Sequence, residues 1–186
     1  MRIVGGTLGG RVIIGPKAGA MAIRPTTDRL RQSVFNILDH GIGVTWQGTR
    51  VLDLFAGTGA LSYEAISRGA AFALLVDDGE APRALIRANQ EALGLGGVTR
   101  IFRRDATKLG AITGMEPFDL CFCDPPYRKG LGERALASAA QGGWLKTGAT
   151  IIWEEAADAE PPAPDGFTLV ERRVYGDTAV TFLRFD

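Results

Sequence analysis

The stretch Asp53-Leu54-Phe55-Ala56-Gly57-Thr58-Gly59-Ala60-Leu61 determines how this chain folds. It continues an apolar run that begins at Val51, and it leads into a segment with helical spacing. The pattern therefore predicts a strand end, a tight turn and the start of a helix. Gly57 and Gly59 permit backbone angles and close approaches that a side chain would block. A ligand-binding turn at the end of a parallel strand is the expected result.

The residues that follow alternate between short apolar runs and amphipathic segments. Short strands separated by helices imply right-handed crossovers and a parallel sheet covered on both faces. The two last runs are joined by Gly176-Asp177, which predicts a closing antiparallel hairpin. Strands are expected over 51–55, 71–76, 99–103, 118–123, 149–154, 167–175 and 178–185, and helices over 60–68, 81–93 and 133–140.

The amino-terminal segment has a different pattern. Arg2–Val4 and Arg11–Ile14 are β-like runs on either side of a glycine-rich turn, which predicts a small hairpin. A helix is expected next, capped by Thr26 or Thr27 and stopped at Gly41.

Composition favours one globular domain. The chain has 186 residues, of which 46% are hydrophobic, enough for a single core. No run approaches the roughly 18 apolar residues of a membrane span, and the first residues lack a secretory signal, so we expect a cytoplasmic protein. Cys121 and Cys123 are expected to be buried, reduced thiols on one strand face, and His40 a residue at a helix end. No metal site is expected.

Charge is unevenly distributed although the net charge is zero. Residues 1–50 hold seven basic and two acidic side chains, a local charge of +5. A protein polarised in this way can hold a phosphate backbone on one face, although a scattered, solvated surface is the alternative. The candidate nucleic-acid contacts are Arg2, Arg11, Arg24 and Arg29.

The glycine turn favours one class of cofactor. It carries no lysine of the P-loop type, and Ser62 stands where a dinucleotide motif has its third glycine. Asp53 would repel a pyrophosphate but would suit the cationic amino-acid end of S-adenosylmethionine. A nicotinamide-dependent oxidoreductase is therefore a disfavoured alternative. The candidate cofactor-binding residues in this stretch are Asp53, Phe55, Ala56, Gly57 and Gly59.

Two further acids stand at predicted strand ends. Asp77 ends the second strand, where a carboxylate can accept both hydroxyls of a ribose. Asp105 follows the third strand and could receive an adenine amino group, although a simple helix cap is nearly as good an interpretation.

The tetrapeptide Asp124-Pro125-Pro126-Tyr127 closes an apolar run and suggests the chemistry. Two prolines fix the backbone and leave its carbonyls free as acceptors. The Asp124 carboxylate and the Pro125 carbonyl could accept both N–H groups of an exocyclic amine, localise its lone pair and stabilise charge developing on nitrogen. Tyr127 could stack on the base. All four residues are candidate catalytic residues, and methyl transfer to a nucleobase amine is the predicted reaction.

Five segments together resemble the bacterial RsmD-type family, and they appear in family order: Arg2–Gly6, Arg24–Arg29, Asp53–Leu61, Glu64–Ala70 and Asp124–Tyr127. The resemblance implies a class I S-adenosylmethionine-dependent methyltransferase, a Rossmann-like α/β fold with a mostly parallel seven-stranded sheet that ends in an antiparallel hairpin. It also implies a small N-terminal β-hairpin that contacts RNA. We therefore expect an extension over residues 1–25 and a methyltransferase domain over 26–186.

The same resemblance implies methylation of the N2 amine of a guanine in 16S ribosomal RNA, guanine 966 in the family, within the 30S subunit or an assembly intermediate, by a monomer. Asp53, Gly57 and Gly59 would then hold the methionine part of the cofactor, Asp77 the ribose and Asp105 the adenine. Adenine-N6 methylation of DNA or RNA stays open as an alternative, as does a binding module for ribosome assembly without turnover.

Overall fold

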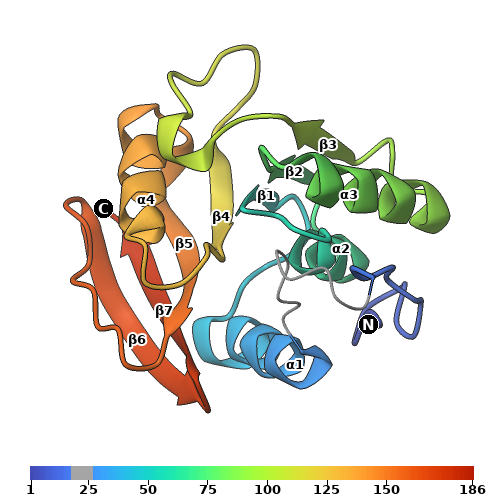
Figure 1. Cartoon of the computed structure of the whole chain (residues 1–186), viewed down its shortest axis with the longest axis horizontal. Helices are drawn as coiled ribbons and strands as arrows, with labels where there is room; N and C mark the ends of the chain where they lie inside the picture. Colours follow the sequence, from blue (N-terminus) through green and yellow to red (C-terminus); the bar gives the residue numbers. More distant parts are fainter. Residues whose placement is uncertain (18–26) are drawn as a thin grey trace.

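The computed structural model describes residues 1–17 and 27–186. A seven-stranded sheet in the order β3-β2-β1-β4-β5-β7-β6 forms its centre (Figure 1). Strands β1 to β5 are parallel, and β7 is antiparallel to both of its neighbours. The predicted fold is therefore confirmed. The strands are β1 (Arg50–Leu54), β2 (Phe72–Val76), β3 (Thr99–Phe102), β4 (Phe118–Cys123), β5 (Leu145–Ala156), β6 (Phe167–Tyr175) and β7 (Thr178–Phe185).

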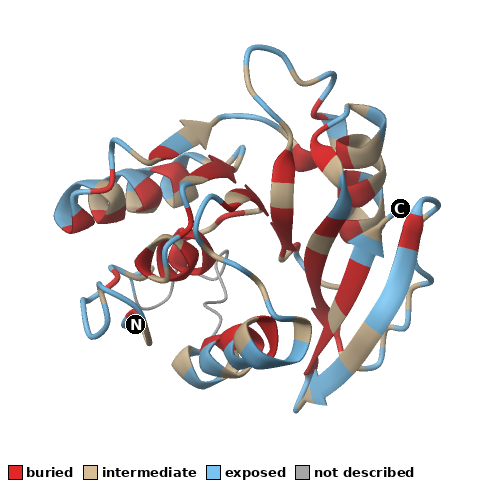
Figure 2. Ribbon diagram, turned by 180° about the vertical axis from the view of Figure 1, so that it is seen from behind, coloured by how far each residue is buried: buried red, intermediate tan, exposed pale blue. Residues whose placement is uncertain are grey.

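Helices cover both faces of the sheet, and each face has its own apolar core. One core lies under α1 (Asp28–Asn36), α2 (Ala60–Ser67) and α3 (Glu80–Leu93); we call this side the α1–α3 face. The other core includes residues of α4 (Leu131–Gln141) and of the short 3₁₀ turn η2 (Ala106–Lys108). Figure 2 shows the buried strands between these layers and the largely exposed edge strand β6.

Consecutive strand residues enter opposite cores, as the alternation of side chains requires. In β4, Leu120 and Phe122 pack under the α1–α3 face, while Cys121 and Cys123 pack on the other face. Both cysteines are free and buried, which confirms their interpretation as core thiols.

Most predicted boundaries lie within two residues of those in the structure, and two differences have an identifiable cause. The first helix does not stop at Gly41 but continues as a π-helical turn, η1 (Ile37–Ile42), whose last turn contains His40. Gly43 ends it, because Gly43 and not Gly41 adopts the left-handed conformation, with φ of 76°. Strand β5 begins at Leu145, earlier than the predicted 149.

The amino-terminal runs pair antiparallel, as predicted, but through a single bridge between Arg2 and Val12. The Ile3 N–H donates to the Arg11 carbonyl at 2.9 Å. Ile3 and Ile13 are buried in the core under the α1–α3 face, so this hairpin packs on the main sheet unit. Thr27 caps α1 by accepting from the Leu30 N–H at 3.2 Å; Arg24 and Thr26 lie outside the described residues.

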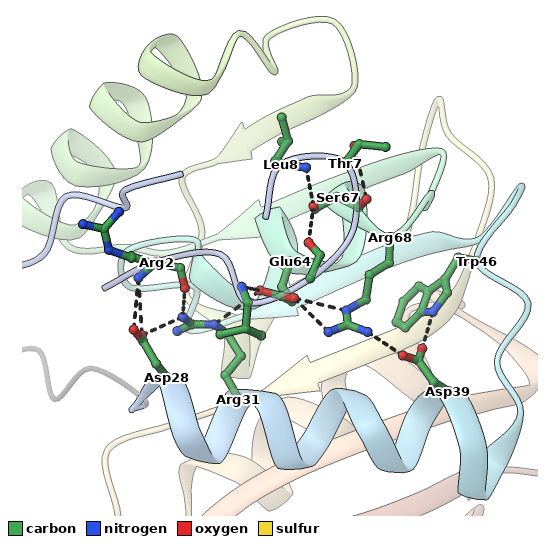
Figure 3. Close-up of polar contacts among 12 residues, drawn as sticks. Arg2, Thr7, Leu8, Asp28, Arg31, Asp39, Trp46, Glu64, Ser67 and Arg68 are labelled. Atoms are coloured by element: carbon green, nitrogen blue, oxygen red, sulfur yellow. Dashed lines mark hydrogen bonds and ion pairs between the residues drawn. The ribbon is translucent and has the colours of Figure 1, made fainter. Parts of the chain in front are cut away.

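A buried ionic network holds the hairpin against α1 and α2 (Figure 3). Glu64 on α2 is fully buried and accepts from the Val4 N–H at 2.8 Å. Its carboxylate also pairs with Arg68 at 3.0 Å and with buried Arg31 of α1 at 3.6 Å. Arg68 continues the network to Asp39. We call these residues the Glu64 network.

No helix within residues 1–17 and 27–186 is long and apolar enough to cross a membrane.

Candidate active site

Four acidic side chains stand at the carboxyl ends of four neighbouring strands. Asp77 follows β2, Asp53 lies in β1, Asp124 follows β4 and Glu154 lies in β5. The residue two positions before each acid packs in the core under the α1–α3 face: Leu75, Val51, Phe122 and Ile152. Because side chains alternate along a strand, all four acids point to the same side of the sheet.

A cleft of about 640 Å³ lies at these strand ends, and all four acids line it. It sits where the strand order reverses between β1 and β4, the position at which open α/β sheets bind ligands. Both sequence motifs meet here, since the glycine turn and Asp124–Tyr127 line the same cleft. Thr27, which caps α1, and Leu30 in α1 complete its wall.

The glycine turn is fixed by backbone contacts to the neighbouring strand. The Ala56 N–H donates to the Val76 carbonyl at 3.0 Å. Phe55 has a positive φ of 61°, an uncommon angle for a residue with a side chain. A Cβ on Gly59 would lie 2.6 Å from the Tyr63 ring, so close helix packing requires glycine there in addition to its φ of 81°. Phe55, Ala56 and Gly57 line the cleft.

Asp53 is buried, with 1% of its surface exposed. The Ser62 hydroxyl donates to its Oδ2 at 2.6 Å. Burial raises the pKa of Asp53 to about 7; the Ser62 hydrogen bond opposes this shift, and the charges of Asp124 and Asp77 add to it. The carboxylate therefore gains or loses its proton near neutral pH.

Replacing Asp53 with asparagine should stabilise the ligand-free protein at pH 8. The folded pKa of about 7 lies above the unfolded value, so the folded wild type loses stability as pH rises between about 4 and 7. Asparagine has no such penalty. The gain should be about 1–4 kcal/mol at pH 8, because each pKa unit corresponds to about 1.4 kcal/mol, and it should vanish near pH 4.

Urea unfolding of both proteins at pH 4, 5, 6, 7 and 8 measures this difference. Asp78→Asn is the matched control, because Asp78 is an exposed acid that lines the same cleft. A gain from Asp53→Asn that is the same at every pH would contradict the buried, titrating carboxylate.

Asp77 holds the turn in place. Its two oxygens accept from the Gly57 N–H at 3.0 Å and from the Gly79 N–H at 2.9 Å. Burial raises the pKa of Asp77, against these two hydrogen bonds. Each carboxylate oxygen keeps a second lone pair, so a ribose hydroxyl can still be accepted there.

Asp105 lies outside the main cleft, in a small adjoining pocket that shares Phe55 and Asp77 with it. Its Oδ1 accepts from the Thr107 hydroxyl at 2.7 Å and the Thr107 N–H at 2.8 Å, which makes Asp105 the cap of η2. These bonds lower the pKa of Asp105. The cap interpretation is confirmed, and a contact to adenine stays a prediction.

The Asp124–Tyr127 loop is held at both ends. The Asp124 N–H donates to the Leu54 carbonyl of β1 at 3.4 Å. Pro125 is buried and Pro126 is exposed, while the Tyr127 hydroxyl contacts the Thr178 hydroxyl of β7 at 3.2 Å. The loop is therefore tied to β1 on one side and to the closing hairpin on the other.

The residue after this loop anchors it to β5. Arg128 adopts a positive φ of 61°, and its N–H donates to Glu155 Oε1 at 2.9 Å. Its guanidinium reaches both carboxylate oxygens of Asp158, at 2.8 and 2.9 Å. Neighbouring β5 residues thus have different roles, because Glu155 anchors the loop and Glu154 lines the cleft.

The cleft is strongly acidic. Among its described lining residues, Arg128 is the one cationic side chain, and it is paired with Asp158. Such a site favours a cationic ligand over a phosphate, so it fits the sulfonium and ammonium groups of S-adenosylmethionine. The acids that line it are Asp53, Asp77, Asp78, Asp124 and Glu154. Within the described ranges, no group of three or more His, Cys, Asp or Glu side chains is arranged to hold a metal ion.

The described residues among the predicted RNA contacts lie on the surface and do not line the cleft. Arg2, Arg11 and Arg29 are exposed, and Arg24 falls in the part of the chain that the structure does not describe. The Arg2 and Arg11 guanidinium groups donate to the carbonyls of Gly10 and Ala92, at 2.9 and 2.8 Å. None of the three residues described lines the cleft.

Sequence reasoning missed several residues that line the cleft, among them Leu30, Glu154 and Thr178. Glu154 carried a usable signal, since it ends the apolar run Ile151-Ile152-Trp153 just as Asp124 ends its own run. Thr178 carried none, because its position beside Tyr127 depends on how β7 returns to the sheet.

Several solved structures with this architecture are described as methyltransferases. The chain is similar to the putative methyltransferase yhhF from Escherichia coli, with a TM-score of 0.83 and 31% identity over 100% of this chain and 98% of that one. It shares the fold of magnesium protoporphyrin IX methyltransferase from Synechocystis PCC 6803 with bound SAM, with a TM-score of 0.63 and 16% identity over 85% and 79% of the two chains. The sheet therefore defines a class I S-adenosylmethionine-dependent methyltransferase fold.

Within this class, the chain belongs to the RsmD-type family, whose model, described as conserved hypothetical protein 95, matches residues 1–184. It is 36% identical over 180 residues to ribosomal RNA small subunit methyltransferase D of Escherichia coli K12, covering 96% of this chain and 87% of the relative. It is 32% identical over 187 residues to the putative rRNA methyltransferase YlbH of Bacillus subtilis, covering 99% and 98%. The predicted family membership is confirmed.

Proposed function

We propose that this protein transfers a methyl group from S-adenosylmethionine to the exocyclic N2 amine of a guanine in small-subunit ribosomal RNA. The observation that carries the proposal is the cleft in which Asp53 and Asp124 face the same side of one sheet. One acid suits a cationic cofactor and the other suits an amine. Relatives named as ribosomal RNA small subunit methyltransferases support the RNA substrate.

The half of the cleft formed by β1 and β2 would bind the cofactor. S-adenosylmethionine supplies an electrophilic methyl group on a sulfonium. Asp53 and the glycine turn would hold its amino-acid end, and Asp77 the ribose. Because burial raises the pKa of Asp53 to about 7, a cationic ligand would also draw the proton off this carboxylate.

The half of the cleft formed by β4 and β5 would bind the substrate base. The Asp124 carboxylate and the Pro125 carbonyl would accept the two N–H groups of the amine, so that its lone pair points toward the cofactor half of the cleft. These bonds strengthen as positive charge develops on nitrogen. As the methyl group is transferred, the cofactor would leave as the thioether S-adenosylhomocysteine, and the nitrogen would give up one proton to the Asp124 carboxylate or to solvent. Tyr127 would stack on the base, and its contact to Thr178 fixes the ring from behind.

A base inside a duplex would have to be unpaired or flipped to enter the cleft. The hairpin residues Arg2 and Arg11, together with Arg29 of α1, would hold the phosphate backbone around it. We place the reaction in the cytoplasm, on the 30S subunit or an assembly intermediate, and we propose that the protein acts as a monomer.

The test is transfer of a radiolabelled methyl group to small ribosomal subunits from a host that lacks this gene. Digestion of the RNA and mass spectrometry then identify the modified nucleoside. N2-methylguanosine is the expected product. N6-methyladenosine would overturn the guanine assignment, and absence of label from subunits, assembly intermediates and naked RNA would overturn the activity itself.

A further inference from the structure

We propose that Glu154 determines base specificity by accepting the N1–H of the target guanine while Asp124 accepts its N2 amine. This inference deepens the function proposed above and rests on it. In this arrangement, the two carboxylates at the ends of β4 and β5 together recognise one edge of the base.

The first support is the register of the two strands. Cys123 of β4 pairs in parallel with Trp153 of β5, so Asp124 and Glu154 each follow a paired residue and lie level with one another. Neighbouring strands are about 4.8 Å apart, and the two acids point to the same face of the sheet. Both line the cleft. One flat group entering there can contact both carboxylates.

The second support is how firmly Glu154 is placed. It lies in the interior of β5, where its backbone pairs with Val180 of β7, and only 2% of its surface is exposed. Its carboxylate is therefore held in one place at the cleft, where it can accept from a base that presents an N–H and repel a base that presents a lone pair.

The base edges supply the discrimination. Guanine presents two adjacent donors on its Watson–Crick edge, N1–H and the N2 amine, whereas adenine presents its amine beside the N1 lone pair. Asp124 and the Pro125 carbonyl alone would accept either amine. Glu154 adds an acceptor that matches guanine N1–H and repels the adenine lone pair. A site built to bond an N–H discriminates strongly against analogues that lack it, and here a carboxylate oxygen would face the adenine lone pair.

The experiment uses 2-aminopurine, which keeps the amine at C2 but has a lone pair at N1. The guanine that the full-length protein methylates is replaced by 2-aminopurine in synthetic ribosomal RNA, and kcat/KM is measured for both RNAs with wild type, Glu154→Gln and Glu154→Ala. The wild type should prefer guanine. Glu154→Gln should lower the ratio of kcat/KM for guanine to that for 2-aminopurine by about 10- to 100-fold, the range expected for one hydrogen bond to a charged group, because its amide can donate to N1.

Glu160→Gln is the matched control, the same chemical change at an exposed position outside the cleft lining; its ratio should equal that of the wild type. Binding of S-adenosylmethionine should be retained by every variant. A wild type that accepts 2-aminopurine as well as guanine overturns the inference even if a Glu154 variant fails to fold. An unchanged ratio in Glu154→Gln and Glu154→Ala also overturns it, while N2-methylguanosine as the product leaves the proposed function standing.

Discussion

Replacing Asp124 with alanine should lower the rate constant for methyl transfer by about 10³-fold, the effect of removing one electrostatic group that stabilises charge in a transition state. The Asp124 carboxylate is proposed to hold an N–H of the substrate amine as that nitrogen becomes positive. S-adenosylmethionine binding should be largely retained, since the cofactor residues belong to β1, β2 and the glycine turn.

Single-turnover kinetics on ribosomal subunits measure the chemical step, and calorimetry measures cofactor binding. Asp124→Asn should keep part of the activity, because an amide carbonyl still accepts a hydrogen bond but carries no charge. Asp119→Asn is the control on the same strand: Asp119 lies near the start of β4, where it accepts from Lys146 at 2.8 Å, and it does not line the cleft. Full activity in Asp124→Ala would remove this residue from the mechanism.

That the glycine turn and the Asp124–Tyr127 tetrapeptide lie at the same edge of the sheet could be predicted from sequence, because each of them ends an apolar run. Carboxyl ends of parallel strands meet at one edge of a sheet, so two motifs that each end such a strand can be placed at the same edge from sequence alone. Their common face followed only once the register was known: Asp53 pairs with Phe122, and Asp124 lies two residues further along. Glu154 ends the predicted strand over 149–154, but no ligand-binding motif adjoins it, so sequence reasoning assigns no role to it.

The predicted end of the first helix and the predicted start of β5 were wrong because backbone angles, and not residue types, decide where these elements begin and end. Gly41 and Gly43 are both plausible helix stops in the sequence, but only Gly43 takes the left-handed angle that closes η1. Strand β5 continues through Gly148, despite its φ of 84°, because β4 supplies a pairing partner on both sides of an irregularity. Tertiary contacts override local preference at both places.

Buried charge was the least predictable feature. Glu64 and Arg31 read in the sequence as ordinary helix residues, and both are fully buried. They can be buried because each meets groups from elements far apart in the chain, including the Arg2 carbonyl and the Val4 N–H. Only the assembled hairpin, α1 and α2 produce that environment.

Replacing Glu64 with alanine should lower the free energy of unfolding by about 3–5 kcal/mol, the cost of breaking a buried ion pair from one side. The change leaves buried Arg31 with Asp28 but without Glu64, and it removes the acceptor of the Val4 N–H. At about 2–4 °C per kcal/mol for a chain of this size, Tm should fall by about 6–20 °C.

Urea unfolding and calorimetry measure the loss, and hydrogen exchange at the Val4 amide reports whether the hairpin has come free. Asp158→Ala is the control. It breaks the exposed ion pair Arg128–Asp158, whose length of 2.8 Å is close to the 3.0 Å of the buried pair Arg68–Glu64. Exposed ion pairs contribute little to the free energy of unfolding. Pairing Glu64→Leu with Arg31→Met should recover part of the stability, since neither charge of the broken pair then remains buried.

The effect on activity separates two roles of the Glu64 network. Glu64 holds the hairpin that carries Arg2 and Arg11, and Arg31 lies one residue after Leu30, which lines the cleft. Below its unfolding temperature, Glu64→Ala should therefore raise KM for ribosomal subunits more than it weakens S-adenosylmethionine binding. Equal losses of both would mean that the network supports the whole sheet. An unchanged KM with a freed Val4 amide would mean that the hairpin does not contact the RNA.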